Sequence, residues 1–250
     1  MADKSRIRLF DEIRGFAIIM MVLHHALIDI TWYHNKSFFI EPDGATIRVL
    51  QFIFVFVFIA LSGTSSNLSR NNLKRGAILL VISAGLSLVT YFMGSDYFII
   101  FGILHCLSIS MIIYGIFEKL FKKTPFMVGF LLLILFIITY NLPNGYIGFE
   151  PFIYNLPANL YTHFWLSPLG FPGGGFESAD YYPLIPYTLL FLGFAIMTKN
   201  IREKKLPKFF YRGIIPFLQP VGRNSLWIYL FHQPVLFALF YLLFDLMKIG

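Results

Sequence analysis

Charged residues and cysteine are both scarce in this sequence. Only 13% of its 250 residues are charged, whereas about a quarter are charged in a typical soluble domain. With 57% hydrophobic residues, the composition excludes an ordinary soluble protein and predicts an integral membrane protein. The single cysteine, Cys106, excludes an intrachain disulfide and a cysteine metal cage.

Sequence motifs for several common chemistries are also missing. No Walker or dinucleotide-binding glycine motif accompanies the basic residues, and no GxSxG motif surrounds the possible serine nucleophiles Ser62, Ser108 and Ser110. The formal net charge is +7, but the basic residues sit in short gaps between apolar runs. That placement is typical of membrane topology, so we expect no nucleic-acid partner.

Long apolar runs are abundant instead. Each is of membrane-spanning length and is expected to be a helix, because a backbone in hydrocarbon must satisfy its own hydrogen bonds. The seven runs cover residues 13–32, 47–68, 73–93, 97–117, 124–140, 182–198 and 225–246. The sequence therefore predicts an all-α integral membrane protein, a bundle of about seven transmembrane helices that forms one domain over residues 1–250.

The distribution of lysine and arginine predicts the orientation of these helices. If the N-terminus is cytosolic, all but Lys36, Arg48 and Lys248 of the 20 Lys and Arg residues lie at cytosolic ends. This bias follows the positive-inside rule and indicates an odd number of spans. We expect a multi-pass protein of the cell membrane, in a bacterium the cytoplasmic membrane.

Two connections between the apolar runs are longer than turns. Residues 141–181 are external in this topology and rich in aromatics, proline and glycine, which favours a lid or binding loop, with a floppy surface loop as the alternative. Residues 199–222 are cytosolic and contain KLPKFFYRGIIPF, which suits a short interfacial helix on membrane lipid, with a nucleotide contact as the alternative.

The first apolar run carries ionisable residues at positions that suggest chemistry. His25 lies eleven positions after Arg14, a rise of roughly 16 Å, so an arginine at one membrane face leads to an imidazole near mid-depth. Asp29 is one helical turn from His25 and can fix its tautomer. Ionisable residues in a membrane are costly, so we expect a function for these residues and for His24. The alternative is that they only bond neighbouring helices or face a wet crevice.

Histidines recur at similar depths in two later runs. His105, in FGILHCLSIS, lies roughly 12 Å below the external face, and His232, in GRNSLWIYLFHQP, lies roughly 14 Å from the cytosolic mouth. Pro234 can kink the last run around such a site, and His34 lies just outside the first run. A zinc site is a rival use of these histidines. However, the adjacent pair in the first run points about 100° apart, so we expect no metal.

Charged residues at the two membrane faces are candidates for substrate contacts. At the external face, Asp180 and Tyr181 begin DYYPLIPY, where the acid can bond a polar acceptor or simply cap a helix. On the cytosolic side, the phosphates of a cofactor would meet cations, although most such cations only enforce orientation. The cytosolic set is Arg14, Lys74, Arg75 and Arg223.

Several fragments together resemble one known family. Arg14, Gly15 and the histidine pair, SG in the second run, FGILH, DYYPLIPY and GRNSLWIYLFHQP resemble bacterial members of the heparan-alpha-glucosaminide N-acetyltransferase family, over almost the whole chain. That family looks like a branch of the transmembrane acyltransferases, which deliver an acyl group from cytosolic acyl-CoA to a glycan across the membrane. Acyltransferase-three relatives carry an arginine, ten residues and a histidine in the first span, which Arg14 and His25 reproduce.

The lysosomal animal enzyme of this family differs in the first span. It has asparagine where His25 aligns, and its active histidine lies just after the span, where His34 is the nearest counterpart. The present chain is also shorter and has no large luminal domain, so we do not expect heparan itself as the acceptor.

The resemblance implies a membrane-bound acyltransferase. Acetyl-CoA, or another short acyl-CoA, would enter from the cytosol, and a hydroxyl or amine of an extracytoplasmic sugar or glycan would approach from outside. His25, oriented by Asp29, is the expected general base, and Asp180 and Tyr181 are expected to bind the acceptor. Direct transfer and an acyl-histidine intermediate both fit. The further catalytic candidates are His24, His34, His105 and His232.

Two other functions are also compatible with parts of the sequence. A proton-coupled transporter or channel can use the same midplane residues as a relay, although the odd span count and the lack of repeats speak against it. A non-catalytic receptor with seven spans is disfavoured by the many buried ionisable groups. A homo-oligomer fits any of these functions.

Overall fold

The computed structural model describes residues 6–32, 44–201 and 206–246. Within these ranges, five helices are long and apolar enough to cross a membrane, and two shorter apolar helices accompany them. The long helices are α1 (Arg8–Trp32), α2 (Ala45–Ser66), α3 (Asn72–Met93), α6 (Phe126–Thr139, extended to Asn144 by a short 3-10 turn) and α10 (Ser225–Phe240). The shorter ones are α4 (Ile103–Ile116) and α7 (Leu184–Met197). The predicted all-α polytopic membrane fold is confirmed.

The fourth helix starts later than the sequence predicts. A run beginning at residue 97 was expected, but a 3-10 turn (η1, Ser95–Tyr97) and an extended segment precede α4. The extended segment is held by the residues before α7: Ala179 N donates to the Phe98 carbonyl at 2.9 Å, and Tyr182 N donates to the Phe101 carbonyl at 3.3 Å. These hydrogen bonds satisfy the backbone of the segment before α4 without a helix. Apolar composition alone does not reveal that residues far away in the sequence supply them.

The chain forms two compact units, which we describe separately. The terminal unit comprises residues 1–58 and 205–250, and the central unit comprises residues 59–204. The boundary falls within α2. The prediction of a single transmembrane domain stays a prediction.

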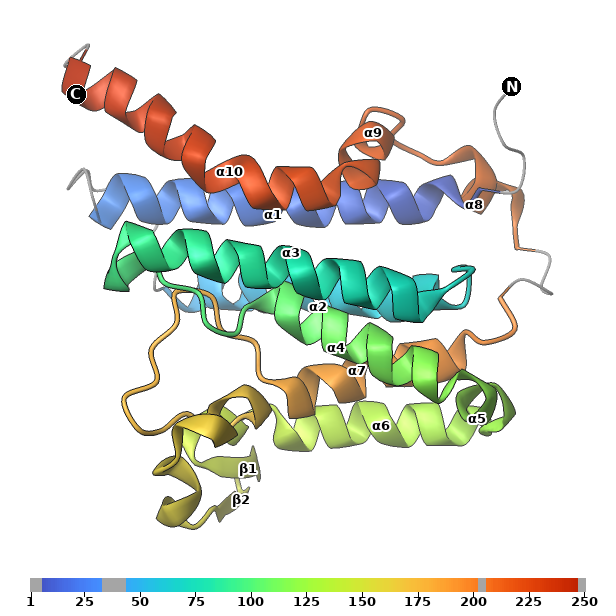
Figure 1. The fold of residues 1–250 in the computed structure, drawn as a ribbon. Helices are drawn as coiled ribbons and strands as arrows, with labels where there is room; N and C mark the ends of the chain where they lie inside the picture. The colour runs from blue at the N-terminus through green and yellow to red at the C-terminus, as the bar shows by residue number, and fades with distance from the viewer. Residues whose placement is uncertain (1–5, 33–43, 202–205, 247–250) are drawn as a thin grey trace. The chain divides into compact units, whose positions relative to one another are not determined.

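In the terminal unit, α1 packs along α9 (Leu218–Arg223) and α10 (Figure 1). Two glycines let α1 and α9 approach with their backbones in contact. A Cβ on Gly15 would lie 2.3 Å from the Leu218 carbonyl oxygen, and one on Gly222 would lie 1.8 Å from the Asp11 carbonyl oxygen. Small residues at a helix crossing permit this approach, which a larger side chain would prevent.

The last helix of the terminal unit contains a proline. Pro234 lies inside α10, and a six-residue π-helix (η5, Tyr241–Leu246) follows it. Proline lacks an N–H, so it removes one helical hydrogen bond and favours a bend. Figure 1 shows α10 bending away from α1 toward the C-terminal end. The predicted kink in this span is therefore observed.

The two short helices before α10 occupy the predicted interfacial segment. They are α8 (Lys208–Arg212) and α9, rather than one interfacial helix. Gly213, with φ +76°, ends α8. The Glu12 side chain of α1 then ties this connection down, accepting from Ile214 N at 2.6 Å and from Gln219 Nε2 at 2.8 Å. Contact of this segment with lipid stays a prediction.

In the central unit, α4 packs on α3 and α7, and α7 packs on α6. A buried polar network ties α2 to two of these helices. Asn67 accepts from the Tyr114 hydroxyl at 2.7 Å and donates through Nδ2 to the Ala195 carbonyl at 2.8 Å and to Thr198 Oγ1 at 3.1 Å. Each polar atom here is satisfied, so the network orders the unit without a buried unpaired group.

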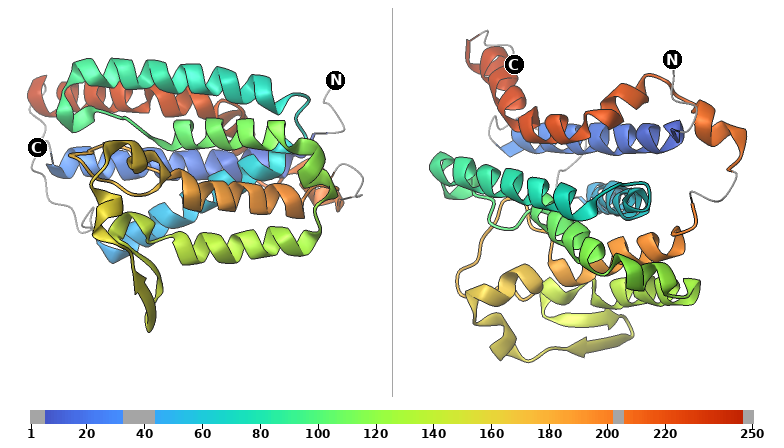
Figure 2. Two further views of the ribbon diagram at one scale, coloured as in Figure 1. Left: turned by 60° about the horizontal axis from the view of Figure 1, so that its bottom comes forward. Right: turned by 45° about the vertical axis from the view of Figure 1, so that its right-hand side comes forward.

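The 141–181 connection is a folded lobe rather than a floppy loop. Its antiparallel hairpin, β1 (Tyr146–Phe149) and β2 (Phe152–Asn155), projects from the end of α6 (Figures 1 and 2). The Tyr161 hydroxyl donates to the Leu142 carbonyl at 2.6 Å, and the Tyr181 hydroxyl donates to the Ser167 carbonyl at 2.5 Å. We call residues 142–182 the connecting lobe. Its 3-10 turns are η2 (Leu142–Asn144), η3 (Ala158–Tyr161) and η4 (Phe164–Leu169). A binding role for the lobe stays a prediction.

Candidate active site

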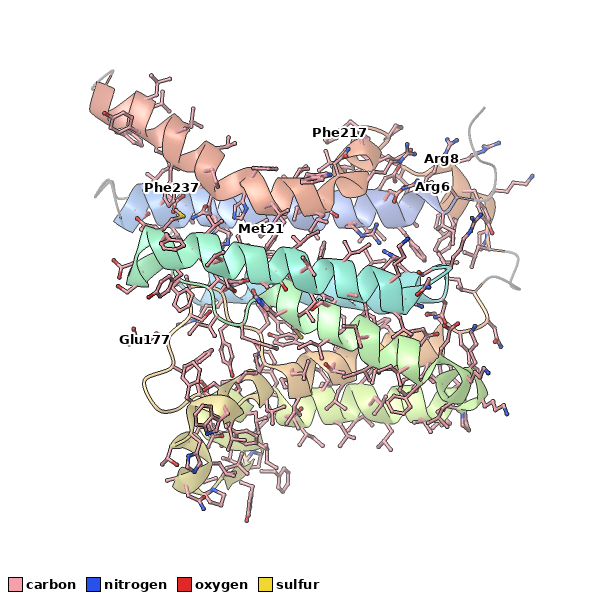
Figure 3. The ribbon with its side chains drawn as sticks, in the orientation of Figure 1. Arg6, Arg8, Met21, Glu177, Phe217 and Phe237 are labelled. Atoms are coloured by element: carbon pink, nitrogen blue, oxygen red, sulfur yellow. The ribbon has the colours of Figure 1, made fainter. Side chains whose placement is uncertain are left out.

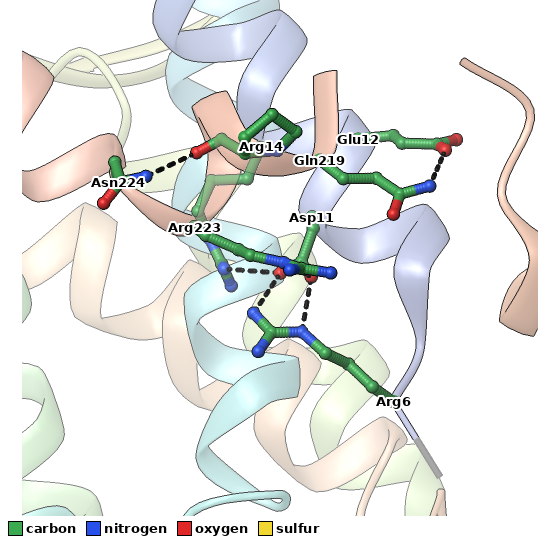
Figure 4. A network of polar contacts seen from close by, with 8 residues as sticks. Arg6, Asp11, Glu12, Arg14, Gln219, Arg223 and Asn224 are labelled. Carbon is green, nitrogen blue, oxygen red and sulfur yellow. Dashed lines mark hydrogen bonds and ion pairs between the residues drawn. The ribbon is translucent and has the colours of Figure 1, made fainter. Parts of the chain in front are cut away.

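Three arginines surround one buried carboxylate in the terminal unit (Figure 4). Asp11 accepts from Arg6 through Nε at 2.6 Å and Nη2 at 3.1 Å. Arg223 Nε lies 3.4 Å from the same carboxylate, and Arg14 Nη1 lies 3.7 Å from it. The Asp11 side chain is 6% exposed, whereas those of Arg6 and Arg223 are 46% and 44% exposed. We call these four residues the arginine cluster.

The arginine cluster keeps a positive balance. Three guanidiniums against Asp11 leave a net charge of +2, and the neighbouring carboxylate Glu12 reduces it to +1 if it is counted. Each guanidinium has five N–H donors, so most donors are not used by Asp11. Exposed arginine donors held by a buried acid form a suitable receptor for an anionic phosphate.

The helix crossing fixes two of these arginines. Arg14 precedes Gly15 on α1, and Arg223 follows Gly222 on α9, so the backbone contact at the two glycines fixes the positions of both arginines. Figure 3 shows Arg6 and Arg8 at the same end of the terminal unit, with Phe237 toward the other end. The structure thus brings the predicted residues Arg14 and Arg223 together.

The other predicted cytosolic cations, Lys74 and Arg75, belong to the central unit. Both begin α3 and are exposed. Asn71 caps this helix by accepting from the Lys74 backbone N–H at 2.9 Å. That contact explains where α3 starts, and the phosphate role of the two side chains stays a prediction.

Two imidazoles from α1 and α10 lie side by side in the terminal unit. The ring centroids of His25 and His232 are 4.9 Å apart, and the planes are inclined by 57°. His24 is an edge-on neighbour of His25, with centroids 5.6 Å apart, and it also contacts Phe54 of α2. Histidines separated by more than 200 positions in the sequence therefore form one cluster.

His232 has a fixed tautomer. Its Nδ1 lies 2.6 Å from the Tyr229 carbonyl oxygen. Because a carbonyl only accepts, Nδ1 carries the hydrogen and Nε2 of the neutral ring keeps a lone pair. Nε2 is buried and has no hydrogen-bond partner among the described residues. A buried, unprotonated imidazole nitrogen is arranged as a proton acceptor.

Asp29 is buried beside this histidine cluster, at 2% exposure. Gln233 Nε2 donates to its Oδ1 at 3.5 Å, a long hydrogen bond between α10 and α1. The predicted pairing of Asp29 with His25 stays a prediction. The Gln233 carbonyl oxygen, Oε1, is buried and has no partner within the described ranges, so a second polar atom next to His232 is available to a ligand.

His105, in the central unit, has a different environment. Its Nδ1 accepts from Gly102 N at 3.3 Å, and its Nε2 lies 3.3 Å from Ser87 Oγ. Since the Ser87 hydroxyl donates to the Ile99 carbonyl at 2.6 Å, it accepts from His105 Nε2–H. Both ring nitrogens are thus used to hold the start of α4, and the predicted catalytic role of His105 stays a prediction.

The predicted acceptor residues have clear structural contacts. Asp180 Oδ2 accepts from Ile103 N at 3.0 Å and so caps α4. A Cβ on Gly102 would lie 2.4 Å from that oxygen, so the acid packs directly on the helix start. Burial raises the pKa of Tyr181, whose hydroxyl donates to Ser167 as described above. Acceptor binding by Asp180 and Tyr181 stays a prediction.

His34 lies outside the described residues. Among the residues that are described, no group of three or more His, Cys, Asp and Glu side chains is placed to hold a metal ion. Sequence reasoning missed the roles of Arg6, Asp11 and Gln233. The signals were weak: an acid amid basic residues near the N-terminus, and an amide next to His232.

Comparison with known proteins identifies a family for the chain. The family model described as heparan-alpha-glucosaminide N-acetyltransferase, catalytic, matches residues 6–234. No curated protein and no solved structure matches the chain.

Proposed function

The chain belongs to the heparan-alpha-glucosaminide N-acetyltransferase family, and from that premise we propose a specific reaction for this membrane acetyltransferase. An acetyl or other short acyl group moves from cytosolic acyl-CoA to a hydroxyl or amine of an extracytoplasmic sugar. The observation that carries the proposal is the buried, unpartnered Nε2 of His232 beside His25. The arginine cluster of the same unit supports an anionic donor.

Arg6, Arg14 and Arg223 bind the phosphates of the donor. Their guanidiniums gather around one carboxylate, and guanidinium groups suit the oxygens of a phosphate. His25 lies eleven residues along α1 from Arg14, a rise of roughly 16 Å. The extended arm of an acyl-CoA would carry its thioester from the arginines toward the histidines.

His232 acts as the general base in this scheme. Its Nε2 removes the proton from the acceptor hydroxyl or amine as the acceptor atom attacks the thioester carbonyl carbon. The carbon–sulfur bond then breaks, and the thiolate takes the proton from His232, which leaves the base neutral again. We assign this role to His232 rather than His25 because the Tyr229 carbonyl fixes the His232 tautomer. His25 lies against the ring of the base, with the two ring centroids 4.9 Å apart.

The test is labelled acetyl-CoA turnover by full-length protein in proteoliposomes with a mixture of soluble amino sugars. His232→Gln should lower turnover about a hundred- to ten-thousandfold, the range for loss of a positioned base, and should leave acetyl-CoA binding largely intact. The matched control is His163→Gln, at an exposed histidine of the connecting lobe. Near-normal turnover of the His232 variant would refute its role as the base.

A further inference from the structure

One face of the β1–β2 hairpin is apolar, and three of its four residues are exposed. Paired residues of an antiparallel ladder point to the same side of the sheet, and side chains alternate along each strand. The register pairs Phe149 with Phe152 and Ile147 with Tyr154. These four residues therefore share one face, which we call the aromatic face.

The aromatic face is strongly exposed. Phe152 is 86% exposed, Tyr154 is 66% exposed and Phe149 is 45% exposed. Nearby in the sequence, Trp165 is 78% exposed. Single exposed apolar residues are ordinary on a protein surface, but a contiguous apolar face signals a contact. A two-stranded hairpin is also marginally stable alone in water, so a partner for this face would stabilise it.

The hairpin follows directly on a lipid-facing surface. The apolar span that contains α6 runs to Asn144, and β1 begins at Tyr146 and packs on α6. Outward-facing apolar side chains cover α6 to its end, in agreement with a surface solvated by hydrocarbon. They are Phe126, Met127, Phe130, Leu131, Ile134, Leu135, Ile137 and Ile138. The aromatic face thus begins close to the end of this apolar span.

The charge pattern distinguishes an electrostatic contact with lipid headgroups from the insertion of aromatic rings into the membrane interface. No lysine or arginine occurs between residues 124 and 198, so the hairpin has no cation for anionic headgroups. Tyrosine and tryptophan rings instead favour the polar–apolar boundary, where the ring is buried and the hydroxyl or N–H stays hydrated. We propose that the hairpin lies on the membrane with its aromatic face in the interface of the leaflet where α6 ends, and anchors the connecting lobe there.

Depth measurements on single-cysteine proteins in bilayers test this proposal. Cys106, which is buried, is replaced by serine, and Phe152→Cys or Tyr154→Cys carries a spin label. Asn159→Cys, at an exposed position of the same lobe, is the matched control. We expect collision with a water-soluble relaxant to be about tenfold lower at 152 and 154 than at 159, because the remaining aromatic side chains of the face keep the labelled position in the interface.

Varying the lipid headgroup and adding an acceptor sugar distinguish a membrane contact of the aromatic face from a sugar-binding role. The protection should be the same in phosphatidylcholine and in mixtures with phosphatidylglycerol, because no cation takes part. Equal accessibility at 152, 154 and 159 would overturn the proposal. Protection that arises only when an amino-sugar acceptor is added would also overturn it and would identify the face as a glycan platform. None of these outcomes depends on acyl-transfer activity, so the proposal can fail independently of the proposed function.

Discussion

Two histidines of this chain have opposite tautomers and different partners, and this difference is the reason for proposing His232 as the base. His232 has its hydrogen on Nδ1 and an unpartnered Nε2, whereas His105 uses both nitrogens in hydrogen bonds. The tautomer of each ring depends on its hydrogen-bond partners, which are nearby backbone groups for both histidines and also Ser87 of α3 for His105. Spacing in the sequence predicts how deep in the membrane each histidine lies, but it does not show which group each ring nitrogen contacts.

His25 provides a second test of the histidine cluster. His25→Gln should reduce turnover less than His232→Gln, because the tautomer-fixing bond from Tyr229 remains in place. The measurement is single-turnover transfer from labelled acetyl-CoA with each variant. If His25→Gln is inactive while His232→Gln retains near-normal rates, the base is His25, as the arginine-to-histidine spacing of the sequence predicts.

For the arginine cluster, we expect substitutions of Arg14 and Arg223 to weaken donor binding to different extents. Arg14 is less exposed than Arg223, at 20% against 44%, so its bond to a phosphate is better shielded from water. Arg14→Ala should weaken acetyl-CoA binding by about 1.5–3 kcal/mol, the range for a lost hydrogen bond to a charged group, and Arg223→Ala should weaken it less. Calorimetric titration in detergent measures both, with the exposed Lys119→Ala as the control. Unchanged affinity in both arginine variants would remove the cluster from donor binding.

At the scale of elements, the α1–α9 crossing depends on two glycines. Gly222→Ala places a Cβ against the Asp11 carbonyl and must separate the helices. We expect a loss of about 1–3 kcal/mol of stability, as for overpacking, together with weaker acetyl-CoA binding because Arg223 moves. Thermal unfolding followed with and without acetyl-CoA measures both effects.

Gly85→Ala is the matched control for that substitution. Gly85 lies inside α3, and a Cβ there would meet nothing within 4 Å. Alanine should raise stability by about 0.5–1 kcal/mol, since glycine inside a helix is unfavourable. A destabilising Gly85→Ala, or a harmless Gly222→Ala, would contradict the close-contact account.

The connecting lobe should respond to alkaline pH. Burial raises the pKa values of Tyr161 and Tyr181 above the ordinary value of about 10. The folded lobe therefore favours the neutral phenols. Their contribution to stability is fully present below about pH 10 and is lost as the pH rises through the higher folded-state pKa values.

Hydrogen exchange in the lobe, measured from pH 8 to pH 11, follows this loss directly. Protection of residues 146–176 should fall above about pH 10 while that of α6 persists. Tyr181→Phe lacks an ionisable phenol at that position and should shift the loss of protection to higher pH. If the loss occurs at the same pH in that variant, Tyr181 does not control it.

Most helix positions could be read from the sequence, and the exceptions have local causes. Within the described ranges, apolar length located the five long apolar helices and the two shorter ones, α4 and α7, because a membrane-spanning backbone has few alternatives to a helix. It missed the late start of α4, where the Asp180 side chain and the backbone N–H groups of Ala179 and Tyr182 supply hydrogen bonds from a distant part of the chain. It also missed the hairpin, whose register depends on pairing rather than on composition.

For the whole molecule, the charge distribution predicts the sidedness of the chain. Residues 69–75, 118–124 and 199–222 should be cytosolic and residues 141–181 external, because nearly all basic residues then lie inside. The test uses Asn159→Cys or Lys119→Cys in a protein in which Cys106 is replaced by serine. Each variant is labelled in intact cells. A membrane-impermeant maleimide should react with the former only. Reaction at position 119 and none at position 159 would invert the topology.

Both ends of the chain contribute to the terminal unit, and this determines when a working site can exist during biosynthesis. Arg14 and His25 leave the ribosome long before their partners Arg223 and His232 are made. At ordinary rates of synthesis the interval is roughly 10–40 s. During that time the polar groups of α1 lack their native neighbours in the membrane. The terminal unit can therefore form only after residues 205–250 have been made, and a product that stops before residue 205 lacks α9 and α10, the helices that pack on α1.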